Sequence, residues 1–181
     1  MIMIPKQPDV LRLPVGRLWN GSVCPDKRLS GLVEVQQTED TILVRARTPA
    51  LPARRIPDTP VGSRVDRLWE YDVMEVFFVD EDGQYLEVEI GPGGHYLVLG
   101  FEGPRCLVAD FVDLPFTVRH EVRPDRSAVN ELLIPRELFP TSLRAVNAFL
   151  IAGGQYLAYH PVPGTQPDFH QPDTFPFARL V

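Results

Sequence analysis

The segment from Met74 to Ile90, MEVFFVDEDGQYLEVEI, contains the clearest secondary-structure pattern in the sequence. Two runs within it, Met74–Val79 and Tyr85–Ile90, are rich in β-branched and aromatic side chains and flank a glycine-containing turn at residues 81–83. This pattern is typical of a β-hairpin. It predicts two antiparallel strands, and the register between them decides which side chains share a face.

Two registers compete for this hairpin. A two-residue turn at Asp82–Gly83 would mix apolar and acidic side chains on both faces. A three-residue loop with Gly83 in the left-handed conformation separates the two kinds of side chain, so we predict this register. Its apolar face carries Met74, Val76, Phe78, Leu86, Val88 and Ile90, and its second face carries Glu75, Phe77, Tyr85, Glu87 and Glu89.

The second face brings three carboxylates together. Glu75 lies opposite Glu89, and Glu87 is two residues away, although like charges across a strand pair are destabilising unless something neutralises or separates them. Three functions fit: a site for calcium or another hard cation, an acid/base pair, or carboxylates that accept hydrogen bonds from sugar hydroxyls. The structural alternative is an acidic sheet face that is exposed to water.

The rest of the chain reads as short strands joined by turns, with 19 prolines among 181 residues. Leu32–Gln37 and Thr41–Arg47 predict a second hairpin, and Pro135–Phe139 gives at most one helical turn. Further strands are predicted at Val10–Leu13, Tyr96–Phe101, Cys106–Phe111, Phe116–Val122, Ser127–Ile134, Ala145–Ala152 and Gln155–His160. Without a repeat of about 20 to 50 residues, this pattern predicts an all-β fold, a single-domain antiparallel β-sandwich of jelly-roll or related topology.

Composition limits the classes of partner. Eighteen basic and 24 acidic side chains give a net charge of −6, which argues against nucleic acid and against an anionic membrane. The sequence shows no apolar run of about 20 residues and no signal peptide, so we expect a cytoplasmic protein. Cys24 and Cys106 are then expected to be free thiols.

Aromatic residues just before the hairpin are candidates for ligand contact. Trp69 and Tyr71 would stand at the mouth of a loop, where a ring can stack on a sugar; the alternative is that they belong to the core. The proline-rich segment Pro49–Gly62 predicts a long irregular loop that borders this site.

The remaining chemistry is sparse. His160 and His170 could form a cluster with Asp173, although an Asp–His hydrogen bond that closes the C-terminal segment is the simpler interpretation. The sequence contains no Gly-x-Ser-x-Gly motif, and the glycines of Gly91–Gly94 do not lead into a helix, so neither nucleophilic catalysis nor a phosphate loop is indicated.

Two sets of motifs carry a family resemblance. Residues 68–78, LWEYDVMEVFF, and 82–90, DGQYLEVEI, resemble the central motif of carbohydrate-binding module family 9-like domains, and residues 156–161 and 167–170 are similar to the C-terminal part of that group. The chain also closely resembles an uncharacterised family of stand-alone proteins of about this length.

The resemblance implies a DOMON-like β-sandwich domain over residues 1–181, calcium in some relatives, and a sugar held between aromatic rings beside a carboxylate. Trp69 and Glu75 match the stacking tryptophan and hydrogen-bonding glutamate of those modules. This chain has no second tryptophan after Trp69, which leaves Tyr159, Phe169 or Phe175 as substitutes.

Together these observations predict non-catalytic binding of a carbohydrate or similar small polyhydroxylated ligand. The alternatives are a hydrolase or lyase that uses paired carboxylates, and a protein-interaction module. Calcium is a possible cofactor, and no catalytic residue is assigned. The predicted ligand-binding residues are Trp69, Tyr71, Glu75, Glu87, Glu89, Tyr159 and His170.

Overall fold

The predicted hairpin forms the centre of the larger of two sheets. In the computed structural model, which describes residues 1–51, 53–114 and 116–181, strand β6 (Val73–Asp80) pairs with β7 (Tyr85–Ile90). Glu75 lies opposite Glu89, and Gly83 has a φ of 83° in the connecting loop. The predicted three-residue loop and its register are therefore confirmed.

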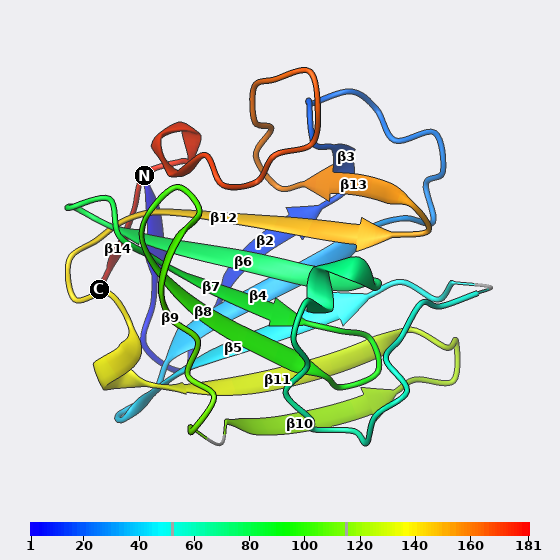
Figure 1. Cartoon of the computed structure of the whole chain (residues 1–181), viewed down its shortest axis with the longest axis horizontal. Coiled ribbons are helices and arrows are strands. Elements are labelled where there is room, and N and C mark those ends of the chain that lie inside the picture. The colour runs from blue at the N-terminus through cyan, green and yellow to red at the C-terminus, as the bar shows by residue number, and fades with distance from the viewer. Residues whose placement is uncertain (52, 115) are drawn as a thin grey trace.

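The two sheets pack face to face, as Figure 1 shows. The seven-stranded sheet has the order β3-β13-β12-β6-β7-β8-β9, and the five-stranded sheet has the order β10-β11-β5-β4-β2. The other strands of the first sheet are β3 (Arg17–Leu18), β8 (Tyr96–Gly103), β9 (Cys106–Ala109), β12 (Leu143–Ala152) and β13 (Gln155–Ala158). The second sheet contains β2 (Leu11–Val15), β4 (Gly31–Gln37), β5 (Thr41–Thr48), β10 (Thr117–Val122) and β11 (Ala128–Pro135).

The predicted all-β antiparallel sandwich is thus confirmed. Each expected strand is present, although β9 and β13 end two residues earlier than predicted. Sequence reasoning missed β3 and a small parallel pair of β1 (Ile2–Ile4) with β14 (Ala178–Leu180), which brings the two termini to the same end of the sandwich (Figure 1).

The main core lies between the sheets. The apolar face of the β6–β7 hairpin is fully buried there against side chains of the five-stranded sheet such as Val33, Val44 and Leu132. The helices of the described residues are short 3-10 turns: η1 (Leu68–Glu70), η2 (Arg136–Leu138) and η3 (Pro172–Thr174). None of them is long and apolar enough to cross a membrane.

The second face of the hairpin is also covered, so the interpretation of a water-exposed acidic face is wrong. Residues 162–175 fold back over it and form a second core, in which Phe169 stacks on Phe149 with ring centroids 4.0 Å apart. Phe175 packs edge-on against Phe77 in the same core. Burial on both faces explains why the two strands of this hairpin are almost wholly buried.

The Pro49–Gly62 loop forms no helix or strand in its described residues; Pro52 lies outside them. The loop braces the turn that carries Trp69, because the backbone N–H of Arg55 donates to Asp72 Oδ2 (2.9 Å) and the Arg55 guanidinium donates to the Glu70 carbonyl. Cys24 is buried and Cys106 exposed, and both are free thiols.

Candidate functional site

A cavity of about 410 Å³ opens on the outer face of the seven-stranded sheet. Its walls come from η1, six strands, the turn between β8 and β9, and the C-terminal segment that covers the sheet. The lining residues are Trp69, Glu75, Glu87, Leu99, Phe101, Arg105, Leu107, Ile151, Tyr156, Pro167, Phe169 and His170.

Two glutamates of the hairpin line this cavity although they are almost completely buried. The exposed fraction of Glu75 and of Glu87 is 3% each, and that of Glu89, which lies next to them on the same face, is 0%. Both carboxyl oxygens of Glu89 lack a hydrogen-bond partner among the described residues. The pairing of β6 with β7 therefore places three carboxyl groups on one buried face.

The five-stranded sheet shows what a satisfied buried carboxylate looks like in this protein. Glu34 is equally buried, but its oxygens pair with Arg45 (3.2 Å), Arg47 (3.0 Å) and Arg12 (3.2 Å). Burial raises the pKa of Glu34, Arg47 and Arg45 lower it, and the net result is a pKa below its usual value. No arginine or lysine pairs with Glu75, Glu87 or Glu89 within the described ranges.

Without such partners the three hairpin carboxyls favour their protonated forms. Burial raises the pKa of Glu75 to about 8. Burial, and then repulsion from Glu75, raise the pKa of Glu87 and that of Glu89 well above the usual range. The backbone N–H of Trp69 acts in the opposite direction and lowers the pKa of Glu89, although it forms no hydrogen bond of good geometry with that carboxyl.

His170 forms one wall and is fixed by Tyr85. The Tyr85 hydroxyl lies 2.8 Å from His170 Nδ1 and accepts a hydrogen bond from the backbone N–H of Arg105 at 3.1 Å. We assign the ring proton to Nε2, which faces Glu87 Oε2 at 3.9 Å, because the Tyr85 hydroxyl can then donate to Nδ1 while it accepts from Arg105. Burial, with a contribution from Arg105, lowers the pKa of His170 to about 4, so the ring is neutral at pH 7.

Aromatic rings stand at the mouth of the cavity. Trp69 is 43% exposed, whereas its neighbour Leu68 is completely buried and anchors the η1 turn. Tyr156 on β13 is 39% exposed, and its ring lies edge-on to Phe169, with centroids 6.2 Å apart. Trp69 and Tyr156 therefore offer accessible ring surface, while the stacked Phe169 is held in place by Phe149.

The structure brings together four of the seven predicted site residues: Trp69, Glu75, Glu87 and His170. Glu89 lies beside them without lining the cavity. The other two predicted residues do not line this cavity. Tyr71 packs against the second core, and Tyr159 packs against the main core, because β13 turns Tyr156 outward and directs Leu157 inward.

Of the proposed substitutes for a second tryptophan, Phe169 lines the cavity and Phe175 is buried in the second core. Sequence reasoning missed Arg105 and Tyr156. It also missed Leu99, which the alternation of β8 could have revealed once that strand is paired with β7, because Leu99 lies opposite Glu87. None of the described residues of the Pro49–Gly62 loop lines the cavity, so the expectation that it borders the site is not met.

The suggested cluster of His160, His170 and Asp173 does not form. The His160 side chain is exposed, and Asp173 pairs with Arg144 at 3.2 Å. Asp168 does close the C-terminal segment, but it accepts from the backbone N–H of His170 (3.0 Å), not from the ring. Among the described residues, no group of three or more His, Cys, Asp and Glu side chains is arranged to hold a metal ion.

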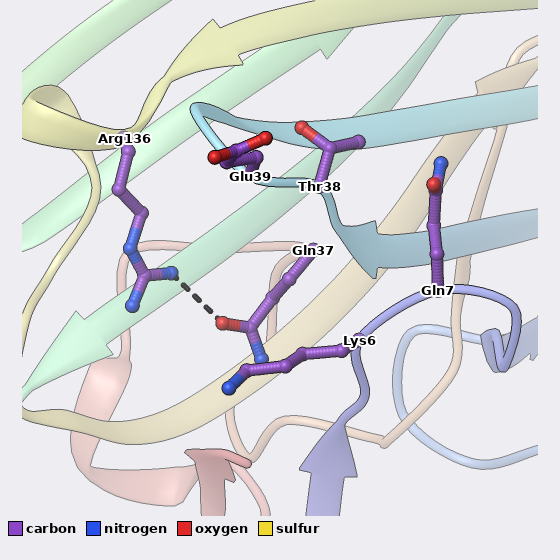
Figure 2. Close-up of a pocket in the computed structure, with 6 residues that line it drawn as sticks. All are labelled: Lys6, Gln7, Gln37, Thr38, Glu39 and Arg136. Atoms are coloured by element: carbon purple, nitrogen blue, oxygen red, sulfur yellow. Dashed lines mark hydrogen bonds between the residues drawn. The ribbon is translucent and has the colours of Figure 1, made fainter.

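A second hollow, of about 450 Å³, lies between the N-terminal segment, the β4–β5 turn and η2 (Figure 2). Its central residue is Gln37, whose Oε1 accepts from Arg136 (3.1 Å) and whose Nε2 donates to the carbonyls of Ile4 (2.6 Å) and Val181 (3.1 Å). Since these hydrogen bonds tie the two termini to the sheet, we interpret this hollow as structural.

The fold and the cavity define an all-β sandwich with an aromatic and carboxyl-lined pocket on one sheet. A crystal structure of a candidate carbohydrate-binding protein from Bacteroides uniformis has a similar fold, with a TM-score of 0.71 over 95% of this chain and 87% of that one, at 18% sequence identity. No family model matches the chain.

Sequence relatives identify the family. The UPF0462 protein C4orf33 homolog of Danio rerio is 34% identical over 148 residues, which are 76% of this chain and 74% of that protein. The Mus musculus homolog is 36% identical over 140 residues, or 67% of this chain and 70% of that protein. The chain belongs to the UPF0462 family.

Proposed function

We propose that the protein binds, without catalysis, a carbohydrate or a similar small polyhydroxylated ligand in the cavity beside Trp69. One observation carries this proposal: the accessible ring of Trp69 stands next to Glu75 and Glu87, two buried carboxyls with no strong hydrogen-bond partner in the described structure. Leaving a buried polar group unpaired is costly, and ligand hydroxyls would relieve that cost.

Each part of the cavity has a role in this mode of binding. The rings of Trp69 and Tyr156 would contact the apolar face of a sugar ring. A protonated carboxyl donates one hydrogen bond and accepts others, so Glu75 and Glu87 can serve sugar hydroxyls in either direction. The Nε2–H of His170 adds a donor at the wall.

The size of the cavity favours a small ligand. Pockets for small molecules span about 300 to 1,000 Å³, and this one lies near the lower end of that range. A mono- or disaccharide fits this size class. With two accessible rings and a few hydrogen bonds, we expect a dissociation constant of about 10 μM to 1 mM.

Two further observations support the proposal. The structural neighbour from Bacteroides uniformis is named for carbohydrate binding. The motif around Trp69 and Glu75 resembles that of carbohydrate-binding module family 9-like domains, and we propose a distant relationship to that DOMON-like group. A calcium ion, which some of those relatives hold, stays a prediction, and the binding mode proposed here uses no metal.

The test is a thermal-shift screen against mono- and disaccharides, followed by calorimetry, on the wild type and on Trp69→Ala. A ligand that prefers the native state raises the melting temperature, and Trp69→Ala should remove most of that rise. Phe177→Ala, which truncates an exposed ring outside the cavity, is the control and should keep it. If no sugar shifts the melting temperature near 10 mM, or if Trp69→Ala binds as well as the wild type, the proposal fails.

Hydrolysis is the second candidate function, because a glutamate with a pKa of about 8 can act as a general acid near neutral pH. That function predicts turnover of nitrophenyl glycosides, which Glu75→Gln would abolish while binding persists. Binding without turnover in the wild type would favour the first proposal.

A further inference from the structure

Acidic side chains outnumber basic ones around the cavity. Its lining contains Glu75 from β6 and Glu87 from β7, and Glu89 lies beside them. Arg105 is the cationic side chain among the described lining residues, and its Nη2 already pairs with Asp168 Oδ1 at 2.8 Å. His170 is neutral at pH 7, and Tyr85 presents a hydroxyl that is already hydrogen-bonded on both sides.

A comparison with Glu34 shows that Glu75 lacks a cationic partner in the described structure. In the five-stranded sheet, arginines surround the buried carboxylate, whereas Glu75 is equally buried and has no hydrogen-bonded or ion-paired partner in the described structure. A cation that enters the cavity would supply the counter-charge that the sheet itself lacks. The Glu75 side chain lines the cavity, so such a cation can reach it.

The aromatic rings suit the same kind of ligand. A ring face attracts an ammonium group as well as the apolar face of a sugar, and Trp69 and Tyr156 both expose ring surface at this cavity. Acidic sugars find no free counter-charge among the described lining residues, because Arg105 is already paired with Asp168.

We propose that the ligand class is an amino sugar in its ammonium form, with the ammonium group against Glu75 and Glu87 and the sugar ring against Trp69. This inference rests on the proposed function and narrows its ligand. Recognition would combine a charge-assisted hydrogen bond to the carboxylates with stacking on the tryptophan.

A proton balance follows from this binding mode. Glu75 is protonated in the free protein at neutral pH and becomes a carboxylate when the ammonium binds, so its proton passes to solvent. Affinity for the amino sugar should therefore rise between about pH 5 and pH 7, because the proton competes with the ligand less strongly as pH increases. A neutral sugar needs no such exchange, and its affinity should change little over this range.

The experiment is calorimetry with glucosamine, N-acetylglucosamine, glucose and cyclohexylamine, at about pH 6.5 in two buffers of different ionisation enthalpy. We expect glucosamine to bind about tenfold more tightly than glucose or N-acetylglucosamine and to release about one proton. Glu75→Gln keeps the size of the side chain and should reduce the preference for glucosamine over glucose to about threefold or less. Glu81→Gln, an exposed position in the turn of the same hairpin, is the matched control and should keep the full preference.

The outcomes separate this inference from the proposed function. Equal binding of glucose and glucosamine would overturn the inference and leave carbohydrate binding intact. Cyclohexylamine binding as tightly as glucosamine would overturn the inference, because the sugar hydroxyls would then add nothing to recognition of the ammonium group. No binding by any sugar would overturn both. Should Glu75→Gln not fold, the wild type decides alone: a glucosamine-to-glucose affinity ratio that does not rise from pH 5 to pH 7 refutes the inference.

Discussion

Glu75 and Glu89 lie directly opposite each other on β6 and β7, with both side chains on the buried outer face of the seven-stranded sheet. Two carboxylates in this relationship would repel each other, and neither has an arginine or lysine partner in the described structure. The protein therefore keeps its hairpin acids largely protonated, and this state has measurable consequences for stability.

The first consequence is an unusual dependence of stability on pH. A carboxyl whose pKa is raised in the folded state stabilises the fold below its unfolded pKa, and this contribution is lost as pH rises through the folded pKa. For Glu75 the folded pKa is about 8, so the free energy of unfolding should fall by about 1 to 2 kcal/mol between pH 6.5 and pH 8. Urea unfolding at both values measures this change.

The pKa shift of His170 affects the free energy of unfolding with the opposite sign and in a different pH range. Its folded pKa is lowered to about 4, so it destabilises the fold only below its unfolded pKa of about 6.5. Above pH 6.5, the change in the free energy of unfolding therefore reports on the carboxyls and not on His170. A free energy of unfolding that is constant or rises between pH 6.5 and pH 8 would show that Glu75 is ionised in the folded protein.

The second prediction concerns Glu89, whose two oxygens are buried without hydrogen-bond partners. Replacing a buried, unsatisfied carboxyl by an apolar side chain of similar shape removes a desolvation cost, so Glu89→Met should stabilise the protein by about 1 to 3 kcal/mol. Chemical denaturation gives the difference.

Glu34→Met is the matched control for that substitution. Glu34 is equally buried, but its removal leaves Arg47 without its carboxylate partner and Arg45 with Glu131 alone. We expect it to destabilise the protein by about 1 kcal/mol, because the arginines are partly exposed to water. If both variants lose stability alike, the two buried carboxyls do not differ in the way the structure indicates.

Much of the fold is predictable from the sequence, because the side-chain pattern of one hairpin and Gly83 together define its register. The small strands β1, β3 and β14 were missed, since two or three residues carry too little periodicity and their pairing depends on distant segments. The burial of Glu75 and Glu89 was equally invisible. It depends on Phe169 and its neighbours, which lie about 80 to 95 residues further along the chain and fold back over the sheet.

The same distinction between local and long-range signals applies to the candidate site. Trp69, Glu75 and Glu87 were found because they are close in sequence and their strand register is defined locally. Tyr156 lines the cavity and Tyr159 packs against the main core. The sequence alone does not distinguish the two positions, because the difference depends on how β13 pairs with β12. Arg105 carries no local signal, since its position in the cavity depends on the contact with Asp168.

The third prediction concerns the hydrogen bond that orients His170. Tyr85→Phe removes the hydroxyl that binds Nδ1 and leaves the backbone N–H of Arg105 without its acceptor. We expect a loss of about 1 kcal/mol in the free energy of unfolding. Nitrogen-15 NMR of the His170 ring should show the Nε2–H tautomer in the wild type and a mixture of tautomers in the variant. A wild-type ring with its proton on Nδ1 would contradict the assignment.

The last prediction separates two neighbouring residues of the η1 turn. Leu68 is completely buried, so Leu68→Ala should cost about 2 to 5 kcal/mol, because it removes apolar contacts and leaves a cavity. Trp69 is 43% exposed, and its ring stacks on the sugar in the proposed binding mode. Trp69→Ala should therefore lower the free energy of unfolding by about 1 kcal/mol or less while removing sugar binding. Thermal unfolding and calorimetry on the two variants measure both quantities. An equal, large loss of stability in the two variants would place Trp69 in the core, and the proposed site would lose its stacking surface.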